Sequence, residues 1–438
     1  MTKNEILLAQ KEFIFPAVFN YFKEPLVISH AKDQFVYDAD GNQYLDFFGG
    51  IVTVSVGHCN EQVNKKVHAQ IDKLEHVSTV FQTEPQVALA KKIASLTPGG
   101  GALRKSFFTN SGTEANEMAV LAARCYTGST EIVALRHSYH GRSAAAMALT
   151  GQGSWKLGLP QAGVTHAVNA YCYRCPFGLT YPSCEVKCAE DIEQVIRTTT
   201  SGKIAAFIAE PIQGVGGFIT PPKEYFKIAV DIVKKYGGIF IADEVQTGWG
   251  RTGSKWFGIE HWDVVPDIIT GAKGLGNGLP IGLTVAKPEI ADAFRGVTLS
   301  TFGGGPVATT AANAVIEYIE EQNILQNTEE TGAYLHGKLL DMKEKHQIIG
   351  DVRGMGLLQA MELVEDRRTK APATAATLQM MEHARENRII IGRGGLYGNV
   401  IRLSPPMNIG KADVDEFILR LDASLTACEA AMGVAAAR

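Results

Sequence analysis

Three charged side chains in the middle of the chain follow short apolar runs, and they are the first candidates for chemistry: Glu210, Asp243 and Lys273. The runs are typical of buried strands in a parallel sheet, and they span 204–209, 239–242 and 268–269. Ligands of such a sheet bind at the carboxyl ends of its strands. We therefore expect the two carboxylates and the amine to converge on one crevice.

A lysine near an acid suits pyridoxal 5′-phosphate (PLP). A lysine holds its aldehyde as a Schiff base, and an acid keeps its ring nitrogen protonated. Lys273 meets the first requirement and Asp243 meets the second. The phosphate of PLP needs N–H donors, which the start of a helix supplies. The run Ser111-Gly112-Thr113 precedes a helical apolar pattern, and its glycine lets the backbone approach closely. The sequence therefore predicts a PLP site.

Each of these features also has an ordinary structural explanation. A lone lysine usually lies on the surface, an Asp after a strand often forms a turn, and Ser-Gly-Thr before a helix is a common cap. The glycine-rich run 272–278 lacks the residue order of a nucleotide-binding loop. The joint occurrence of lysine, acid, helix start and Tyr139, an aromatic residue that can stack on the ring, favours the cofactor site.

The composition is that of an ordinary globular protein and excludes several classes of function. Of 438 residues, 45% are hydrophobic and 20% are charged, and the net charge of −4 offers no basic surface to nucleic acid. No apolar run is long enough to cross a bilayer, and residues 1–8 lack the apolar core of a signal peptide. We therefore predict a cytoplasmic protein with no nucleic-acid or membrane partner.

Four of the seven cysteines lie close together in the sequence, with the spacing C-x2-C-x8-C-x3-C. This spacing can ligate zinc, but the middle gap is short for a zinc ribbon and no histidine lies inside it. We predict no metal and a loop with free or buried thiols, with zinc as the alternative. The four residues are Cys172, Cys175, Cys184 and Cys188.

The elements that must position the candidate residues alternate between strands and helices. Helical spacing of apolar residues at 115–122 and 226–233 predicts a mostly parallel sheet with helices on both faces. After about residue 305 the pattern changes to that of a smaller α+β unit. We predict three parts: an N-terminal segment 1–60 that joins the small domain, a PLP-binding large domain 61–305 and a C-terminal small domain 306–438.

Taken together, these motifs resemble the class III aminotransferases of PLP fold type I over nearly the whole chain. Within that class, the sequence is most similar to the alanine–glyoxylate and ω-amino acid branch. The resemblance implies an α/β fold, with a fold type I large domain and a smaller α+β domain. The matching stretches are 110–116 (NSGTEAN), 139–141 (YHG), 210–214 (EPIQG), 242–248 (ADEVQTG), 250–253 (GRTG), 267–274 (DIITGAKG), 300–304 (STFGG) and 402–406 (RLSPP).

The resemblance implies a role for each matching position. Lys273 would carry the Schiff base, Asp243 would face the ring nitrogen, and Gln246 would bond to the ring hydroxyl. Thr301 would reach the phosphate of the other subunit's cofactor, which implies a homodimer with active sites at the interface. The remaining cofactor contacts would be Ser111, Gly112, Thr113, Tyr139 and His140.

The resemblance also implies the substrates. Arg402 would bind an α-carboxylate, or turn to Glu210 when the substrate has none. By family position, three residues would line the pocket, although each fits core packing equally well: Ile51, Phe81 and Tyr21. The implied reaction moves an amino group from an amino acid or ω-amine donor (alanine, a β- or ω-amino acid, or a primary amine) to a 2-oxo acid such as pyruvate or glyoxylate. The alternative is a PLP racemase, aminomutase or decarboxylase of the same fold.

Overall fold

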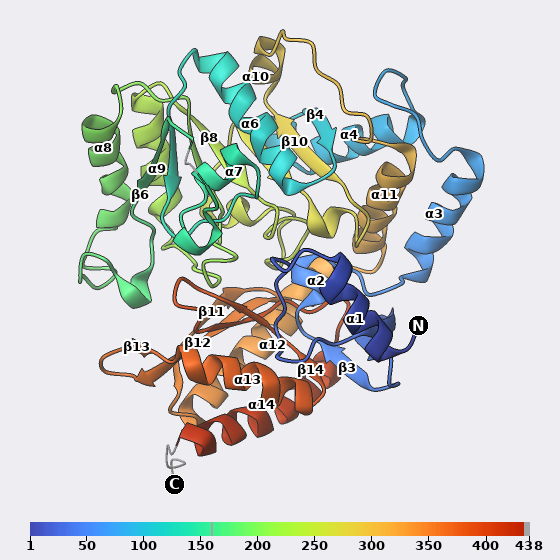
Figure 1. Cartoon of the computed structure of the whole chain (residues 1–438). Helices are drawn as coiled ribbons and strands as arrows, with labels where there is room; N and C mark the ends of the chain where they lie inside the picture. Colours follow the sequence, from blue (N-terminus) through green and yellow to red (C-terminus); the bar gives the residue numbers. More distant parts are fainter. Residues whose placement is uncertain (159–160, 433–438) are drawn as a thin grey trace.

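The largest sheet lies in the middle of the chain and has seven strands, in the order β4-β10-β9-β8-β7-β5-β6 (Figure 1). This computed structural model describes residues 1–158 and 161–432. The five strands β5 to β9 all run parallel to one another. Strand β10 runs antiparallel to its two neighbours, β4 and β9. The predicted mostly parallel sheet is confirmed. Its strands are β4 (Lys105–Thr109), β5 (Ile132–Leu135), β6 (Val164–Ala167), β7 (Ala206–Ala209), β8 (Ile239–Asp243), β9 (Ile268–Gly271) and β10 (Gly282–Ala286).

Successive residues of the central strands face two separate cores, because side chains alternate along a strand. On β8, Ile241 packs in one core with helix α6 (Gly112–Thr127), and Phe240 packs in the other with helix α9 (Tyr225–Lys235). Helices therefore cover both faces of the sheet. This double burial explains why the strands read as continuous apolar runs in the sequence.

Helix α6 starts directly after β4, at the edge of the sheet where the strands end. Ser111 has an extended backbone, and its hydroxyl accepts a hydrogen bond from the amide of Glu114 at 3.3 Å, which caps the helix. Gly128 adopts the left-handed conformation that ends the helix sixteen residues later. The free amides of the first turn therefore point towards the strand ends.

Both ends of the chain contribute to the second part of the molecule, where blue N-terminal elements lie beside orange and red C-terminal ones (Figure 1). One sheet joins β1 (Ile28–Lys32), β2 (Phe35–Asp38) and β3 (Gln43–Asp46) to β14 (Ile389–Ile390), which runs parallel to β3. A second sheet has the order β11-β12-β16-β15. Its strands are β11 (Ile349–Met355), β12 (Leu358–Asp366), β15 (Gly392–Gly394) and β16 (Val400–Leu403).

Long helices complete the fold, and the last three along the chain pack against these two sheets. Those described after residue 300 are α11 (Pro306–Glu321), α12 (Ile324–Lys345), α13 (Thr374–Glu386) and α14 (Lys411–Met432). Near the N-terminus they are α1 (Lys3–Phe13), α3 (Glu61–Lys73) and α4 (Glu84–Leu96). Among the described residues, no helix combines the length and the apolar character that crossing a membrane requires.

Two glycines of α12 allow a matched test of how this helix packs. A Cβ on Gly332 would lie 2.4 Å from the backbone of Gly356, whereas one on Gly337 would meet nothing within 4 Å. We expect Gly332→Ala to lower the free energy of unfolding by about 1–3 kcal/mol through overpacking. Gly337→Ala should raise it by about 0.5–1 kcal/mol, because alanine favours a helix. If thermal denaturation showed the same shift of the midpoint from the wild-type value for both variants, in direction and size, this packing would be contradicted.

Candidate active site

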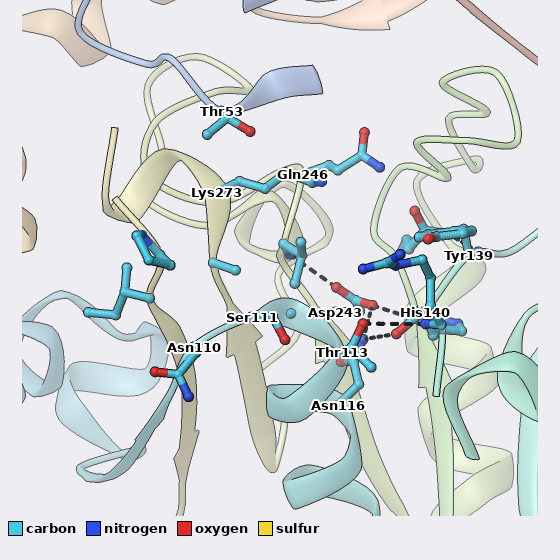
Figure 2. A pocket seen from close by; sticks show the side chains of 18 of the residues that line it. Thr53, Asn110, Ser111, Thr113, Asn116, Tyr139, His140, Asp243, Gln246 and Lys273 are labelled. Carbon is cyan, nitrogen blue, oxygen red and sulfur yellow. Dashed lines mark hydrogen bonds and ion pairs between the residues drawn. The ribbon is translucent and has the colours of Figure 1, made fainter. Parts of the chain in front are cut away.

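A cavity of about 320 Å³ opens where β7, β8 and β9 end and α6 begins (Figure 2). The two carboxylates and the amine that the sequence placed at strand ends all lie on its wall. Nine of the sequence-predicted site residues line it: Ser111, Gly112, Thr113, Tyr139, His140, Glu210, Asp243, Gln246 and Lys273.

Lys273 begins a 3₁₀ turn (Lys273–Leu275) after β9, with a positive φ of 47°. A Cβ on Gly274 would lie 2.3 Å from Oγ of Ser55, so the turn is packed closely from behind. The pKa of Lys273 is lowered to about 8, mainly by burial and also by the charge of Arg402, while Asp243 and Glu210 oppose the shift. Because the neutral amine is the nucleophile, this environment prepares Lys273 to attack a carbonyl near neutral pH.

The carboxylate of Asp243 is only 3% exposed, and protein groups hold both of its oxygens. Oδ2 accepts a hydrogen bond from Nδ2 of Asn116 at 2.7 Å and lies 2.7 Å from Nδ1 of His140. Oδ1 accepts one from the amide of Val245 at 3.1 Å. Figure 2 shows Asp243, Asn116 and His140 meeting beneath Lys273 and Gln246. The acid is therefore fixed in position and buried, as a partner for a protonated ring nitrogen must be.

The first turn of α6 faces the cavity, and protein groups pack so closely around it that two positions require glycine. A Cβ on Gly112 would come within 2.9 Å of Val245, and one on Gly141 would come within 2.5 Å of Oγ1 of Thr113. The free amides and the helix dipole favour a negative charge at this point. The hydroxyls of Ser111 and Thr113 face the same cavity, so the arrangement fits a phosphate group.

Two further wall residues fit an aromatic ring with a polar substituent. Oε1 of Gln246 is buried without a hydrogen-bond partner among the described residues, so it is available to a ligand hydroxyl. Tyr139 presents an aromatic side chain to the cavity and packs edge-on against Trp155, with ring centroids 5.2 Å apart. With the amine, the acid and the helix start, these groups form a set that fits PLP.

Glu210 and Arg402 lie on either side of Gly214. The carboxylate of Glu210 accepts hydrogen bonds from the amides of Tyr139 at 2.9 Å and Gly214 at 2.8 Å, and burial raises its pKa to about 7. Arg402, 2% exposed on β16, donates to the carbonyl of Gly214 at 3.3 Å. In the described part of the chain no ion pair joins the two side chains, and Nε and Nη2 of Arg402 have no partner.

Five predicted residues do not line this cavity: Arg402, Ile51, Phe81, Tyr21 and Thr301. Ile51 is 46% exposed with a positive φ, and Phe81 is 65% exposed. Tyr21 packs edge-on against Phe48, whose ring lies 5.4 Å from the guanidinium of Arg402. Thr301 is exposed in the loop before α11.

The four clustered cysteines line a separate cavity of about 20 Å³. Burial raises the pKa of Cys188 to about 12 and also raises the pKa of Cys172, so both thiols stay protonated at neutral pH. Within residues 1–158 and 161–432, no three His, Cys, Asp or Glu side chains are grouped so that they could hold a metal ion.

The sequence analysis assigned no role to several residues of the cavity wall, among them Asn116, Val245 and Thr53. Asn116 and Val245 stand inside matching motifs, at 110–116 and 242–248, so those motifs contained a signal for them. Thr53 comes from the N-terminal segment, and nothing in its local sequence indicates that it reaches a cavity formed more than 50 residues later.

Comparison with known proteins decides the family. The family model described as aminotransferase class-III matches residues 19–425. The chain belongs to the class III aminotransferases. As a member of that family, it is a PLP-dependent transaminase of fold type I, and the cofactor predicted from Lys273 and Asp243 is confirmed.

Named relatives of this class III aminotransferase cover nearly all of it. It is 46% identical over 96% of its length to the mitochondrial alanine–glyoxylate aminotransferase 2 homolog 2 of Arabidopsis thaliana, of which 87% is covered. It is 39% identical over 94% of its length to the mitochondrial alanine–glyoxylate aminotransferase 2 of Homo sapiens, of which 84% is covered. The leucine/methionine racemase of Thermococcus litoralis is 38% identical, with 98% of this chain and 97% of the racemase covered.

Solved structures agree with the fold. An aminotransferase of Bacillus anthracis superposes with a TM-score of 0.91 at 31% identity, covering 97% of this chain and 98% of that one. An amine transaminase from an uncultivated Pseudomonas species, in a PLP-bound form, superposes with a TM-score of 0.88 at 30% identity, covering 95% and 98%.

The lowered pKa of Lys273 predicts how the class III aminotransferase without cofactor captures PLP. The initial rate of covalent capture, followed by absorbance, should rise with pH and level off above about pH 8, because the amine is then neutral. Arg402→Gln should move this midpoint upward, because its charge is the second cause of the shift. A rate that climbs to about pH 10.5, the ordinary value for lysine, would contradict the geometry.

Proposed function

We propose that this transaminase moves an amino group from an amino acid or ω-amine donor to a 2-oxo acid. The donors would be alanine, a β- or ω-amino acid, or a primary amine, and the acceptors pyruvate or glyoxylate. The observation that carries the proposal is the single cavity in which the buried amine of Lys273 meets Asp243, Glu210 and the start of α6. The names of the relatives, alanine–glyoxylate aminotransferases, support the substrates.

Bound PLP supplies an electron sink for the carbanion of the donor. Nζ of Lys273 would hold the cofactor at rest, and as a free amine it would take up the proton that leaves the donor carbon. Asp243 would accept a hydrogen bond from the protonated ring nitrogen, and the opposite charges would attract each other. Ser111, Gly112 and Thr113 would bind the phosphate, and Oε1 of Gln246 would accept a hydrogen bond from the ring hydroxyl.

Tyr139 and His140 contact the cofactor in this proposal from the loop after β5. Tyr139 stacks on the ring, which its place on the cavity wall supports. His140 acts through Asp243, because its Nδ1 lies 2.7 Å from Oδ2 of that acid. The pair therefore orients the ring and its acidic partner together.

Arg402 and Glu210 adapt the site to two kinds of substrate in this proposal. Arg402 is buried, and two of its nitrogens have no partner among the described residues, which suits a carboxylate bound by two parallel hydrogen bonds. Glu210, whose pKa is raised to about 7, bonds to the amide of Gly214, and Arg402 bonds to the carbonyl of the same residue. In this proposal Glu210 receives the guanidinium when the substrate lacks an α-carboxylate.

We propose a homodimer in which Thr301 reaches the phosphate of the partner's cofactor. Its exposed loop, outside the cavity of its own chain, supports this placement. Ile51, Phe81 and Tyr21 belong to the substrate pocket only in that assembly. The division into 1–60, 61–305 and 306–438 is also a proposal, supported by the strand pairing of β3 with β14. The cytoplasmic location stays a prediction, and relatives at 46% and 39% identity are named mitochondrial.

A racemase is the second candidate, because a leucine/methionine racemase is 38% identical over nearly the full length of both chains. Both reactions remove the same proton from the donor carbon. A transaminase also needs a site for a second, 2-oxo acid substrate, and the adjustable pair of Arg402 and Glu210 favours that reading.

Replacing the anchor tests the assignment of Lys273. Lys273→Ala should abolish turnover, and borohydride should no longer fix cofactor to the chain, as measured by absorbance of the denatured protein. Lys156→Ala is a matched control, because burial also lowers the pKa of Lys156 but it does not line the cavity. Transamination by the Lys273→Ala variant at the wild-type rate would remove the basis of the proposal.

Arg402→Gln tests carboxylate binding. We expect kcat/KM for alanine to fall on the order of 10²-fold, because a buried hydrogen-bonded charge loses its partner. The half-reaction with a primary amine that has no α-carboxylate serves as the internal control and should change less than about tenfold. An equal loss for both donors, measured by single-turnover absorbance, would contradict this role.

A further inference from the structure

Asn116 lies beneath the cavity and connects α6 to β8, to β9 and to the loop after β5. Its Nδ2 donates to Oδ2 of Asp243 at 2.7 Å and to the carbonyl of His140 at 2.9 Å. Its Oδ1 accepts from the hydroxyl of Thr270, on β9, at 2.7 Å. The side chain is 1% exposed, so these bonds have no competition from water. Figure 2 shows Asn116 rising from α6 towards Asp243 and His140.

The orientation of the Asn116 amide is fixed by its neighbours. Turned the other way, its oxygen would face two acceptors, the carboxylate of Asp243 and the carbonyl of His140. Two buried acceptors in contact cost free energy because neither is satisfied. The amide therefore presents both protons to these acceptors, and the hydroxyl of Thr270 satisfies its oxygen.

These bonds leave one acceptor site of Asp243 for a ligand. A carboxylate offers about four lone-pair directions. Oδ2 uses two of them, for Asn116 and His140, and Oδ1 uses one for the amide of Val245. The remaining direction belongs to Oδ1, so this oxygen would accept the hydrogen bond from the ring N–H of the cofactor.

We propose that Asn116 is a positioning residue that fixes Asp243 relative to the phosphate-binding start of α6. Ser111 caps the helix and Asn116 follows five residues later, a rise of about 7.5 Å along one rigid helix. One element thus sets the spacing between the groups that hold the two ends of the cofactor. The inference rests on the proposed role of Asp243 at the ring nitrogen.

Two substitutions at Asn116 test this role. Asn116→Ala removes both donors, and Asn116→Asp keeps the shape but replaces the donors by an acceptor facing Asp243. The dissociation constant of PLP, titrated onto the protein freed of cofactor, should rise on the order of 10- to 100-fold, and more for Asn116→Asp. The pH midpoint of the visible absorption of bound cofactor should also rise by about one unit, because a less protonated ring repels the imine proton less.

Asn399→Ala is the matched control. Asn399 is also 1% exposed, and its Nδ2 also donates to one carboxylate and one carbonyl, those of Glu362 at 3.4 Å and Leu363 at 2.7 Å. Asn399→Ala should lower the thermal midpoint about as much as Asn116→Ala does. It should leave the dissociation constant of PLP within about twofold of the wild-type value, with no shift of the pH midpoint of absorption. Asn116 variants that behave like the control would reduce Asn116 to a structural residue and overturn the proposal.

Two further variants keep the test decisive. Thr270→Val removes the hydroxyl that orients the amide and should weaken PLP binding several-fold in the same direction, on the order of 1 kcal/mol by the ordinary worth of a hydrogen bond. If it binds PLP as wild type does, the proposed orientation is wrong. Asp243→Asn should keep cofactor but lose most turnover. Normal turnover there would contradict the proposed function itself, whereas a severe loss with silent Asn116 variants would contradict only the role of Asn116.

Discussion

A buried carboxylate, that of Asp243, is the constraint on which the rest of this site depends. A charge that is 3% exposed is tolerated only when hydrogen bonds replace the water it has lost. Those bonds come from Asn116 on α6, His140 in the loop after β5, and the amide of Val245 after β8. The hydrogen bonds of this one group therefore connect α6, the loop after β5 and the end of β8.

The sheet topology explains why the other functional groups gather around the same point. Parallel strands end at one edge, so β7, β8 and β9 deliver Glu210, Asp243 and Lys273 to one cavity. Both faces of the sheet are covered by helices, which excludes water from below and lowers the pKa of Lys273 to about 8. Burial also raises the pKa of Glu210 to about 7. The fold therefore brings the pKa values of an amine and a carboxyl group in one cavity close to neutral pH.

The groups at strand ends were predictable because each follows a local apolar run and because motifs carry their spacing. Asn116 was not singled out, since its function depends on Asp243 and Thr270, which are more than 120 residues away in the sequence. Gly214 bonds through its amide to Glu210 and through its carbonyl to Arg402, a detail of backbone placement that sequence spacing does not encode. Ile51, Phe81 and Thr301 are exposed and do not line the cavity of this chain, and spacing along the sequence does not indicate which residues reach the cavity.

The central claim is that Lys273 and Asp243 serve amino transfer between two substrates. The most direct test adds an amine donor alone to the PLP-loaded protein and analyses both the cofactor and the donor. The account predicts that the cofactor is converted to pyridoxamine phosphate, with one oxo product released per chain. Donor recovered as a mixture of enantiomers, with the cofactor unchanged and no oxo product, would contradict it and establish a racemase.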